Sequence, residues 1–174
     1  MRDVALRRKS KKPAKAARGT AAGHCLCGAV AIEIDLPAFW AWHDHGAASR
    51  RAHGAAYATY VGCWKSKVRV TKGAKSMARY EDKSNRTVRS FCGKCGTPLF
   101  YERPSGPRMV NIPRALFDTR TGREPRYHLN LADSPEWAYR QEPLAPLKGY
   151  PGVLIERPRK KRKPLSDELR FLEE

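Results

Sequence analysis

Short runs of alternating apolar and polar residues dominate the chain. The clearest run ends at Ile34, with larger aliphatic side chains at Val30, Ile32 and Ile34 separated by small or polar residues. A period of two is typical of a strand with one buried face. By this criterion we predict strands over residues 29–34, 55–62, 66–71, 77–81, 87–91, 97–102, 108–112 and 127–131.

Turn signals separate these runs at short intervals, for example Lys72-Gly73 and Pro104-Ser105-Gly106-Pro107. Short strands joined by close turns favour antiparallel pairing. The pattern therefore predicts a mostly β domain of short antiparallel strands. One brief helical turn is expected near Arg114–Asp118.

The two ends of the chain differ from this middle part. Residues 1–22 are rich in charge and poor in apolar side chains, which predicts a disordered basic tail. We expect one domain over residues 23–155, whose proline-rich stretch after Trp137 runs extended over the surface. Residues 156–174 form a second basic tail, with a short helix expected over 165–174.

The chain is strongly basic, and the domain itself carries part of the positive charge. The chain of 174 residues carries a net charge of +18, of which +7 falls on residues 1–23 and +2 on residues 156–174. The remaining +9 belongs to the domain itself. Such a surface attracts anionic small molecules or nucleic acid, the latter also through the basic tails. The alternative is that the charge serves solubility alone.

The apolar stretches are too short for a membrane-spanning helix, which needs roughly 18 residues or more. The first residues are charged and contain no apolar leader. We therefore expect a cytoplasmic protein without a membrane partner. A mitochondrial presequence and a nucleic-acid-binding arm are the alternative interpretations of the basic start.

Four of the five cysteines form two close pairs, Cys25-Leu26-Cys27 and Cys92-Gly93-Lys94-Cys95. Thiolates at such spacing suit tetrahedral zinc, and short turns can place both sulfurs of a pair on one metal ion. The sequence predicts one zinc held by Cys25, Cys27, Cys92 and Cys95. Because four thiolates fill the coordination shell, this zinc should be structural. The alternative is two unrelated thiol pairs; Cys63 is expected to be an ordinary core or surface residue.

The segments around these cysteines resemble a known family. Residues 23–30 (Gly-His-Cys-Leu-Cys-Gly-Ala-Val), 50–57 (Arg-Arg-Ala-His-Gly-Ala-Ala-Tyr) and 89–99 (Arg-Ser-Phe-Cys-Gly-Lys-Cys-Gly-Thr-Pro-Leu) follow in order, with later landmarks at residues 125–128 and Trp137. They resemble the glutathione-dependent formaldehyde-activating enzymes, a family that includes centromere protein V. The likeness covers about residues 23–140.

This resemblance implies an Mss4-like β-tent fold and two zinc sites, one structural and one catalytic. It also implies a carbon–sulfur lyase class of reaction, in which glutathione and formaldehyde join as S-hydroxymethylglutathione. The partner implied is therefore glutathione or another small thiol adduct. The catalytic zinc of the family is held by a Cys-x-Cys-x-x-Cys cluster directly before the Arg-Arg pair.

The chain departs from the family at that cluster, because Asp44, Gly46 and Ser49 stand at the three cysteine positions. A metal site rebuilt from His43, Asp44, His45 and His53 is one interpretation. Metal-free acid–base chemistry by these residues is a second, and loss of catalysis a third. In an extended segment, His43 and His45 point to one side and Asp44 to the other.

We accordingly take His43, Asp44 and His45 as the candidate catalytic residues. Arg50, Arg51 and His53 are the candidate substrate-binding residues, since guanidinium groups bind carboxylates through charge-assisted hydrogen bonds. The alternative function is a non-catalytic, zinc-stapled scaffold for anionic partners such as nucleic acid.

Overall fold

The computed structural model describes residues 19–138 and 144–156. Within them, twelve strands form two sheets, and the prediction of a mostly β, antiparallel domain is confirmed. The strands are β1 Thr20–His24, β2 Ala31–Asp35, β3 Trp40–Asp44, β4 Ala58–Trp64, β5 Val68–Lys72, β6 Met77–Asp82, β7 Thr87–Cys92, β8 Pro98–Glu102, β9 Met109–Pro113, β10 Tyr127–Leu129, β11 Leu144–Pro146 and β12 Leu154–Glu156.

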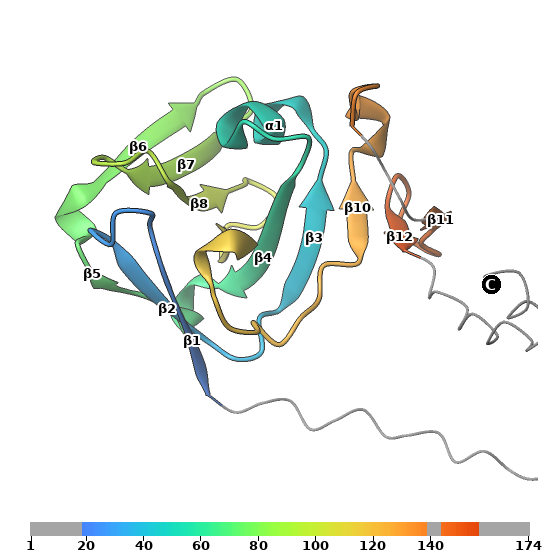
Figure 1. The fold of residues 1–174 in the computed structure, drawn as a ribbon. Coiled ribbons are helices and arrows are strands. Elements are labelled where there is room, and N and C mark those ends of the chain that lie inside the picture. Colours follow the sequence, from blue (N-terminus) through green and yellow to red (C-terminus); the bar gives the residue numbers. More distant parts are fainter. Residues whose placement is uncertain (1–18, 139–143, 157–174) are drawn as a thin grey trace, which may run out of the picture.

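The smaller sheet has the order β1-β2-β5 and the larger one the order β11-β12-β10-β3-β4-β9-β8-β7-β6. All neighbours pair antiparallel except β10 and β3, which run parallel. Figure 1 shows how β10 returns late in the chain to lie beside β3. The larger sheet is therefore completed by a strand that follows β3 by more than eighty residues.

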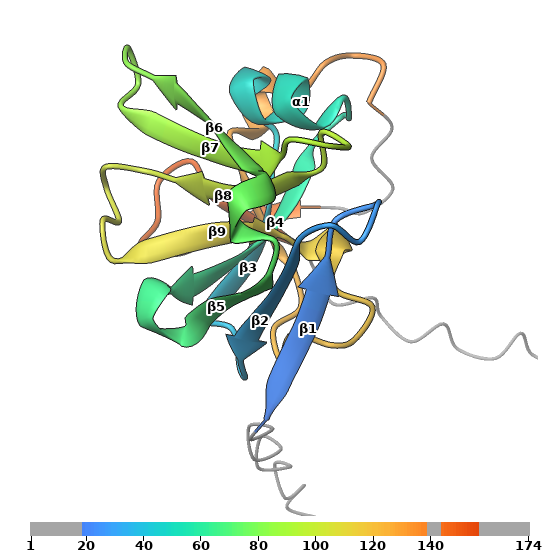
Figure 2. The same ribbon diagram turned by 90° about the vertical axis from the view of Figure 1, so that its left-hand side faces the viewer.

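The main core lies between the two sheets. Ile32 and Ile34 of β2 belong to one buried cluster with Val61 of β4 and Ile112 of β9. Figure 2 shows the smaller sheet lying across the larger one on this side. A second, aromatic core on the opposite face of β3 and β4 is built around Trp42, Ala58 and Tyr60.

Helical structure is limited. One α-helix, α1 Ala47–His53, follows β3 and ends at Gly54, whose φ of 60° is left-handed. Short 3₁₀ turns occur at η1 Lys65–Lys67, η2 Ala74–Ser76, η3 Arg114–Leu116 and η4 Leu131–Asp133. The turn η3 confirms the helical turn expected near Arg114–Asp118. None of the helices in the described ranges is long and apolar enough to cross a membrane.

The connection between β5 and β6 depends on a glycine. Gly73 has a φ of 71°, and a Cβ at this position would collide with the carbonyl oxygen of Ala29, two residues before β2. Only glycine adopts this left-handed conformation without steric cost. The turn that the sequence indicated at Lys72-Gly73 is thus also a close contact between strands.

Several sequence expectations need correction. Residues 20–22, expected within the basic tail, belong to β1. Neither β3 nor α1 was predicted, although the eight predicted strands all occur with boundaries shifted by a few residues. The proline-rich stretch contains the short strands β11 and β12. The rest of the first tail and the helix expected over 165–174 lie outside the described residues.

Candidate metal centre and polar cavity

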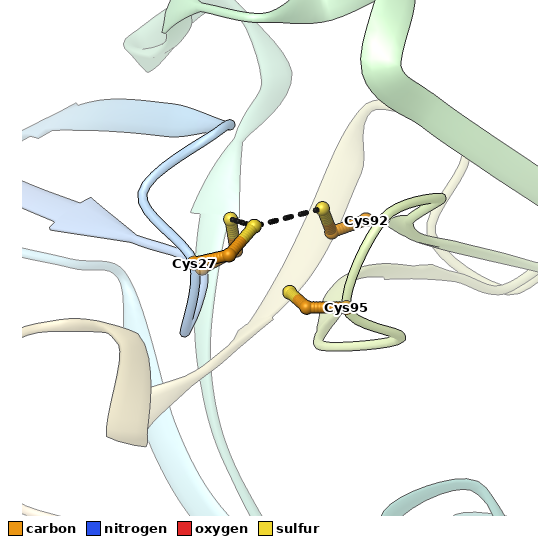
Figure 3. A group of neighbouring side chains, drawn as sticks. Cys27, Cys92 and Cys95 are labelled. Atoms are coloured by element: carbon orange, nitrogen blue, oxygen red, sulfur yellow. Dashed lines mark hydrogen bonds between the residues drawn. The ribbon is translucent and has the colours of Figure 1, made fainter.

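The four paired cysteines come together at the junction of the two sheets. Cys25 and Cys27 lie in the turn between β1 and β2, whereas Cys92 ends β7 and Cys95 lies in the turn before β8. Their sulfur atoms all lie within 4.8 Å of one another (Figure 3). Sγ of Cys27 is 3.6 Å from that of Cys25 and 3.8 Å from that of Cys92.

These distances fit a tetrahedral metal ion. With metal–sulfur bonds of about 2.3 Å, tetrahedral geometry requires sulfur–sulfur distances of about 3.8 Å. The backbone N–H of Val30 donates to Sγ of Cys25 at 3.2 Å. Thr97, through its hydroxyl and backbone N–H, lowers the pKa of the Cys95 thiol to about 5, toward the thiolate that binds metal. The cluster can therefore hold a metal ion, as its spacing predicted.

Cys63 lies apart from this cluster on β4. It is buried, and burial raises the pKa of its thiol to about 11. A protonated, enclosed thiol is unreactive. Cys63 is thus a core residue, as expected.

The end of β3 and the start of α1 form a compact polar network around Asp44. Its Oδ1 accepts hydrogen bonds from the backbone N–H of Gly46 at 3.0 Å and from Nδ2 of Asn130 at 2.8 Å. Its Oδ2 accepts from Oγ of Ser49 at 2.8 Å. Both Asp44 and Ser49 are buried, so these bonds replace the water that the carboxylate would otherwise need. The network brings positions 44, 46 and 49 together.

The network continues through the hydroxyl of Tyr60. This oxygen lies 3.5 Å from Oγ of Ser49, 3.0 Å from Nε2 of His53 and 3.1 Å from a terminal nitrogen of Arg89. Burial and, next, the charge of Arg89 lower the pKa of His53 to about 4. Burial also raises the pKa of Tyr60. At neutral pH, His53 and Tyr60 are therefore both uncharged beside one guanidinium.

His53, Tyr60 and Arg89 line a cavity of about 190 Å³, whose other lining residues come mainly from β6, β7 and β8. Among the lining residues Tyr60 is fully buried and Tyr80 is exposed, so the cavity opens beside Tyr80. The lining combines one cation with histidine and many aromatic rings: His53, Tyr60, Tyr80, Arg89, Phe91, Phe100 and Tyr101. The cavity can hold a small ligand against a base and a positive charge.

The chain also matches a family model. Residues 20–133 match the model of the glutathione-dependent formaldehyde-activating enzyme. The chain belongs to this family. Among solved structures, the crystal structure of a Rhodobacter sphaeroides protein is 27% identical, with a TM-score of 0.49, and the match covers 56% of this chain and 87% of that one. A comparison with curated proteins gives no match.

The candidate residues of this family member separate into two groups. Asp44 and His53 belong to the network beside the cavity, whereas His43 and His45 lie on the other face of the segment, as their alternation predicted. His43 lies within 5.0 Å of the Tyr57 ring and His45 within 5.1 Å, centroid to centroid. His53 therefore does not join them.

A third histidine, His128 of β10, completes the second group. Its Nδ1 lies 2.9 Å from Nε2 of His45, and its ring lies 4.8 Å from that of His43. Within residues 19–138 and 144–156, however, the four cysteines are the only set of three or more potential ligands whose atoms converge. The metal site rebuilt from residues 43–53 stays a hypothesis without a geometric counterpart in this part of the chain.

The paired arginines of α1 do not face the cavity. Nε of Arg50 donates to the carbonyl oxygen of His45 at 3.0 Å, which fixes the start of the helix. Arg51 is exposed on the helix surface. Their role in substrate binding stays a prediction.

Sequence reasoning missed Tyr60, Arg89 and Tyr101 as site residues. Tyr60 stood in a predicted strand and Arg89 in a family motif, but neither position by itself indicated a cavity. The available signal was Arg89 itself, a charged residue in a strand that also contains the apolar residues Val88 and Phe91. A charge in such a place is expected to have a partner or a function.

Proposed function

We propose that this family member interconverts a small hydroxymethyl thioether with its thiol and formaldehyde, at the cavity beside His53. In this proposal the four cysteines hold a structural zinc, and the reaction uses no second metal. The observation that carries it is the convergence of His53, Tyr60 and Arg89 on one cavity. Glutathione is the thiol that the family name suggests.

The bonding around Tyr60 supports His53 as the base. In this proposal the Tyr60 hydroxyl donates to Ser49 and accepts from Arg89, and Nε2 of His53 donates to it as well. Nδ1 is then the basic nitrogen, for which the described residues provide no hydrogen bond. The low pKa keeps this nitrogen unprotonated at neutral pH.

The proposed reaction balances with this one base. Nδ1 of His53 removes the proton of the substrate hydroxyl, the oxygen forms the carbonyl of formaldehyde, and the carbon–sulfur bond breaks with its electron pair on sulfur. His53 then returns the proton to sulfur, giving the free thiol. Arg89 supplies the positive charge that attracts an anionic substrate. The reverse sequence makes the adduct.

Exchange measurements test this proposal. Glutathione and ¹³C-labelled formaldehyde equilibrate with S-hydroxymethylglutathione, and NMR exchange spectroscopy gives the rate. We expect the wild-type protein to accelerate exchange and His53→Gln to lose roughly a hundredfold of that acceleration, in the range of general acid–base catalysis. His24→Gln, on the exposed end of β1, is the matched control. Exchange no faster than in buffer, both with glutathione and with the smaller thiol 3-mercaptopropionate, would refute the proposed activity.

A second candidate function is binding of nucleic acid by a zinc-stapled scaffold. Residues 65–94 contain ten lysines and arginines but two acids, and Lys67, Lys75, Lys83 and Lys94 among them are exposed. Salt-dependent binding to a DNA duplex would support this function. Loss of that binding on removing residues 1–18 and 157–174 would assign it to the tails, whereas retention would assign it to the domain.

A further inference from the structure

Arg89 is a partly buried cation that lacks an ion-pair partner within the described ranges. Its terminal nitrogens donate to Tyr60 at 3.1 Å and to Ser49 at 3.4 Å, both neutral hydroxyls. The carboxylate of Asp44 reaches it only through the Ser49 hydroxyl. A guanidinium has five N–H donors, so three have no acceptor among the described residues. Buried charges usually have a partner, and the open space beside Arg89 is where one could lie.

Arg89 lines the cavity and packs against an aromatic ring. Its guanidinium carbon lies 4.1 Å from the centre of the Tyr101 ring, so one face of the group is covered. Donors in the plane of a guanidinium match the two oxygens of a carboxylate. Neutral His53 adds no second charge to the site. Arg89 is the one charged side chain among the described residues that line the cavity, whereas Asp44 lies behind Ser49, so the cavity offers a site for one negative group.

The remaining wall is apolar and flat. Phe91, Phe100 and Tyr80 surround the space on the side of β6, β7 and β8. Aromatic rings favour stacked or edge contacts with other planar groups. A ligand whose body is flat or apolar would gain most from this wall.

Size limits the ligand further. The cavity has a volume of about 190 Å³. Sites for drug-sized ligands usually measure about 300–1,000 Å³. A whole tripeptide would extend out of the mouth of this space, whereas an acid the size of benzoate fits within it.

We propose that this cavity binds a compact monocarboxylate with a flat or apolar body, its carboxylate on Arg89 and its body between the aromatic rings. The proposal rests on the proposed function in that it narrows the substrate of the same site to a short thiol acid rather than a tripeptide. Carboxylate binding can nevertheless be measured without turnover.

Titration calorimetry of the zinc-loaded protein tests it with matched pairs of ligands. Benzoate and benzamide have nearly the same shape but differ in charge, so we expect benzoate to bind at least tenfold more tightly. We also expect 3-mercaptopropionate to bind more tightly than glutathione. These comparisons require no substitution and cannot be affected by misfolding. Equal affinities within the benzoate pair would overturn the proposal.

A substitution locates the site. We expect Arg89→Gln to bind benzoate at least tenfold more weakly, whereas Arg108→Gln, in the exposed turn before β9, should bind it as the wild type does. Unchanged binding by a folded Arg89→Gln protein would overturn the proposal. Benzoate binding without formaldehyde exchange would refute only the proposed reaction; exchange without benzoate binding would refute only the present inference.

Discussion

At the scale of single residues, Asp44 organises the polar part of the molecule. One buried carboxylate accepts hydrogen bonds from a backbone N–H, a hydroxyl and an amide, which come from three points between residues 46 and 130. Hydrogen bonds to charged acceptors contribute more than neutral ones, and a buried polar group left without its partner is costly. Asp44 thus fixes α1 against both β3 and the segment after β10.

Replacing Asp44 by asparagine tests this role. The substitution replaces one acceptor oxygen by an NH₂ group, which is a donor. This group then faces another donor, either the Ser49 hydroxyl or the N–H groups of Gly46 and Asn130. We expect Asp44→Asn to lower the free energy of unfolding by about 1–3 kcal/mol, measured by urea denaturation. The control is Asp118→Asn, whose side chain is almost fully exposed. Similar effects of the two substitutions would contradict the assignment.

The low pKa of His53 predicts a dependence of stability on pH. Burial holds this pKa at about 4 in the folded protein, below the usual 6.5, so the unfolded chain binds the proton first as the pH falls. The contribution of neutral His53 to the free energy of unfolding is therefore fully present above about pH 6.5 and is lost as the pH falls toward 4. Between pH 7 and pH 4, we expect the free energy of unfolding to fall by about 1–2 kcal/mol less in His53→Gln than in the wild type. This difference is smaller than the full pKa shift would give, because the ring is partly exposed to solvent.

Urea denaturation at pH 7 and pH 4 measures this difference. His24→Gln serves as the control, because His24 is exposed and should leave the profile unchanged. If the free energy of unfolding falls equally in the wild type and in His53→Gln between the two pH values, the pKa of His53 is not lowered by folding.

The sequence predicted the geometry of neighbouring residues but not of distant ones. Alternation along an extended segment was enough to separate His43 and His45 from Asp44. The contacts of Tyr60 with His53 and Arg89 could not be predicted, because they join positions on α1, β4 and β7 that meet only when the sheet forms. His128 was missed as a neighbour of His45 for the same reason.

At the scale of elements, β3 and α1 were missed for different physical reasons. In β3, Ala41, Trp42 and Asp44 are all buried, because the strand is central to its sheet and covered on both faces. The alternation that marks a half-buried strand is therefore absent. The helix α1 spans only seven residues and its Gly46 N-cap makes no side-chain hydrogen bond, so it also lacks a sequence signal.

The turn between β5 and β6 offers a test at this scale. Gly73→Ala would place a methyl group against the Ala29 carbonyl and impose a left-handed φ on alanine. We expect a loss of more than about 2 kcal/mol, since strain and a steric clash act together. Gly106→Ala is the control, because a Cβ there meets only ordinary contact with Met109 at 3.6 Å. Comparable stability of both variants would show that residue 73 neither adopts the left-handed conformation nor lies against the Ala29 carbonyl.

At the scale of the whole molecule, the cysteine cluster joins the two sheets. One pair belongs to the β1–β2 turn of the smaller sheet and the other to the β7–β8 turn of the larger sheet. A metal ion there constrains elements that otherwise meet mainly through apolar packing. Because ligation and folding are coupled, loss of the metal should weaken the contact between the sheets.

Metal content and stability should therefore change together. We expect about one zinc per chain by elemental analysis. We expect Cys92→Ser to lose this zinc and to have a free energy of unfolding lower by several kcal/mol, because structural zinc contributes strongly to folding. Cys63→Ser, which removes a thiol outside the cluster, should keep the metal. Two zinc ions per chain would revive a second site among residues 43–53.

The separation of the two cysteine pairs also affects how the chain is made. Cys27 and Cys92 are 65 positions apart. At ribosomal rates of about 5–20 residues per second, the first pair leaves the ribosome about 3–13 seconds before the second. During that interval a nascent dithiol has neither its metal shell nor the larger sheet to protect it. Zinc supply and a reducing environment during translation should therefore determine the yield of correctly folded protein.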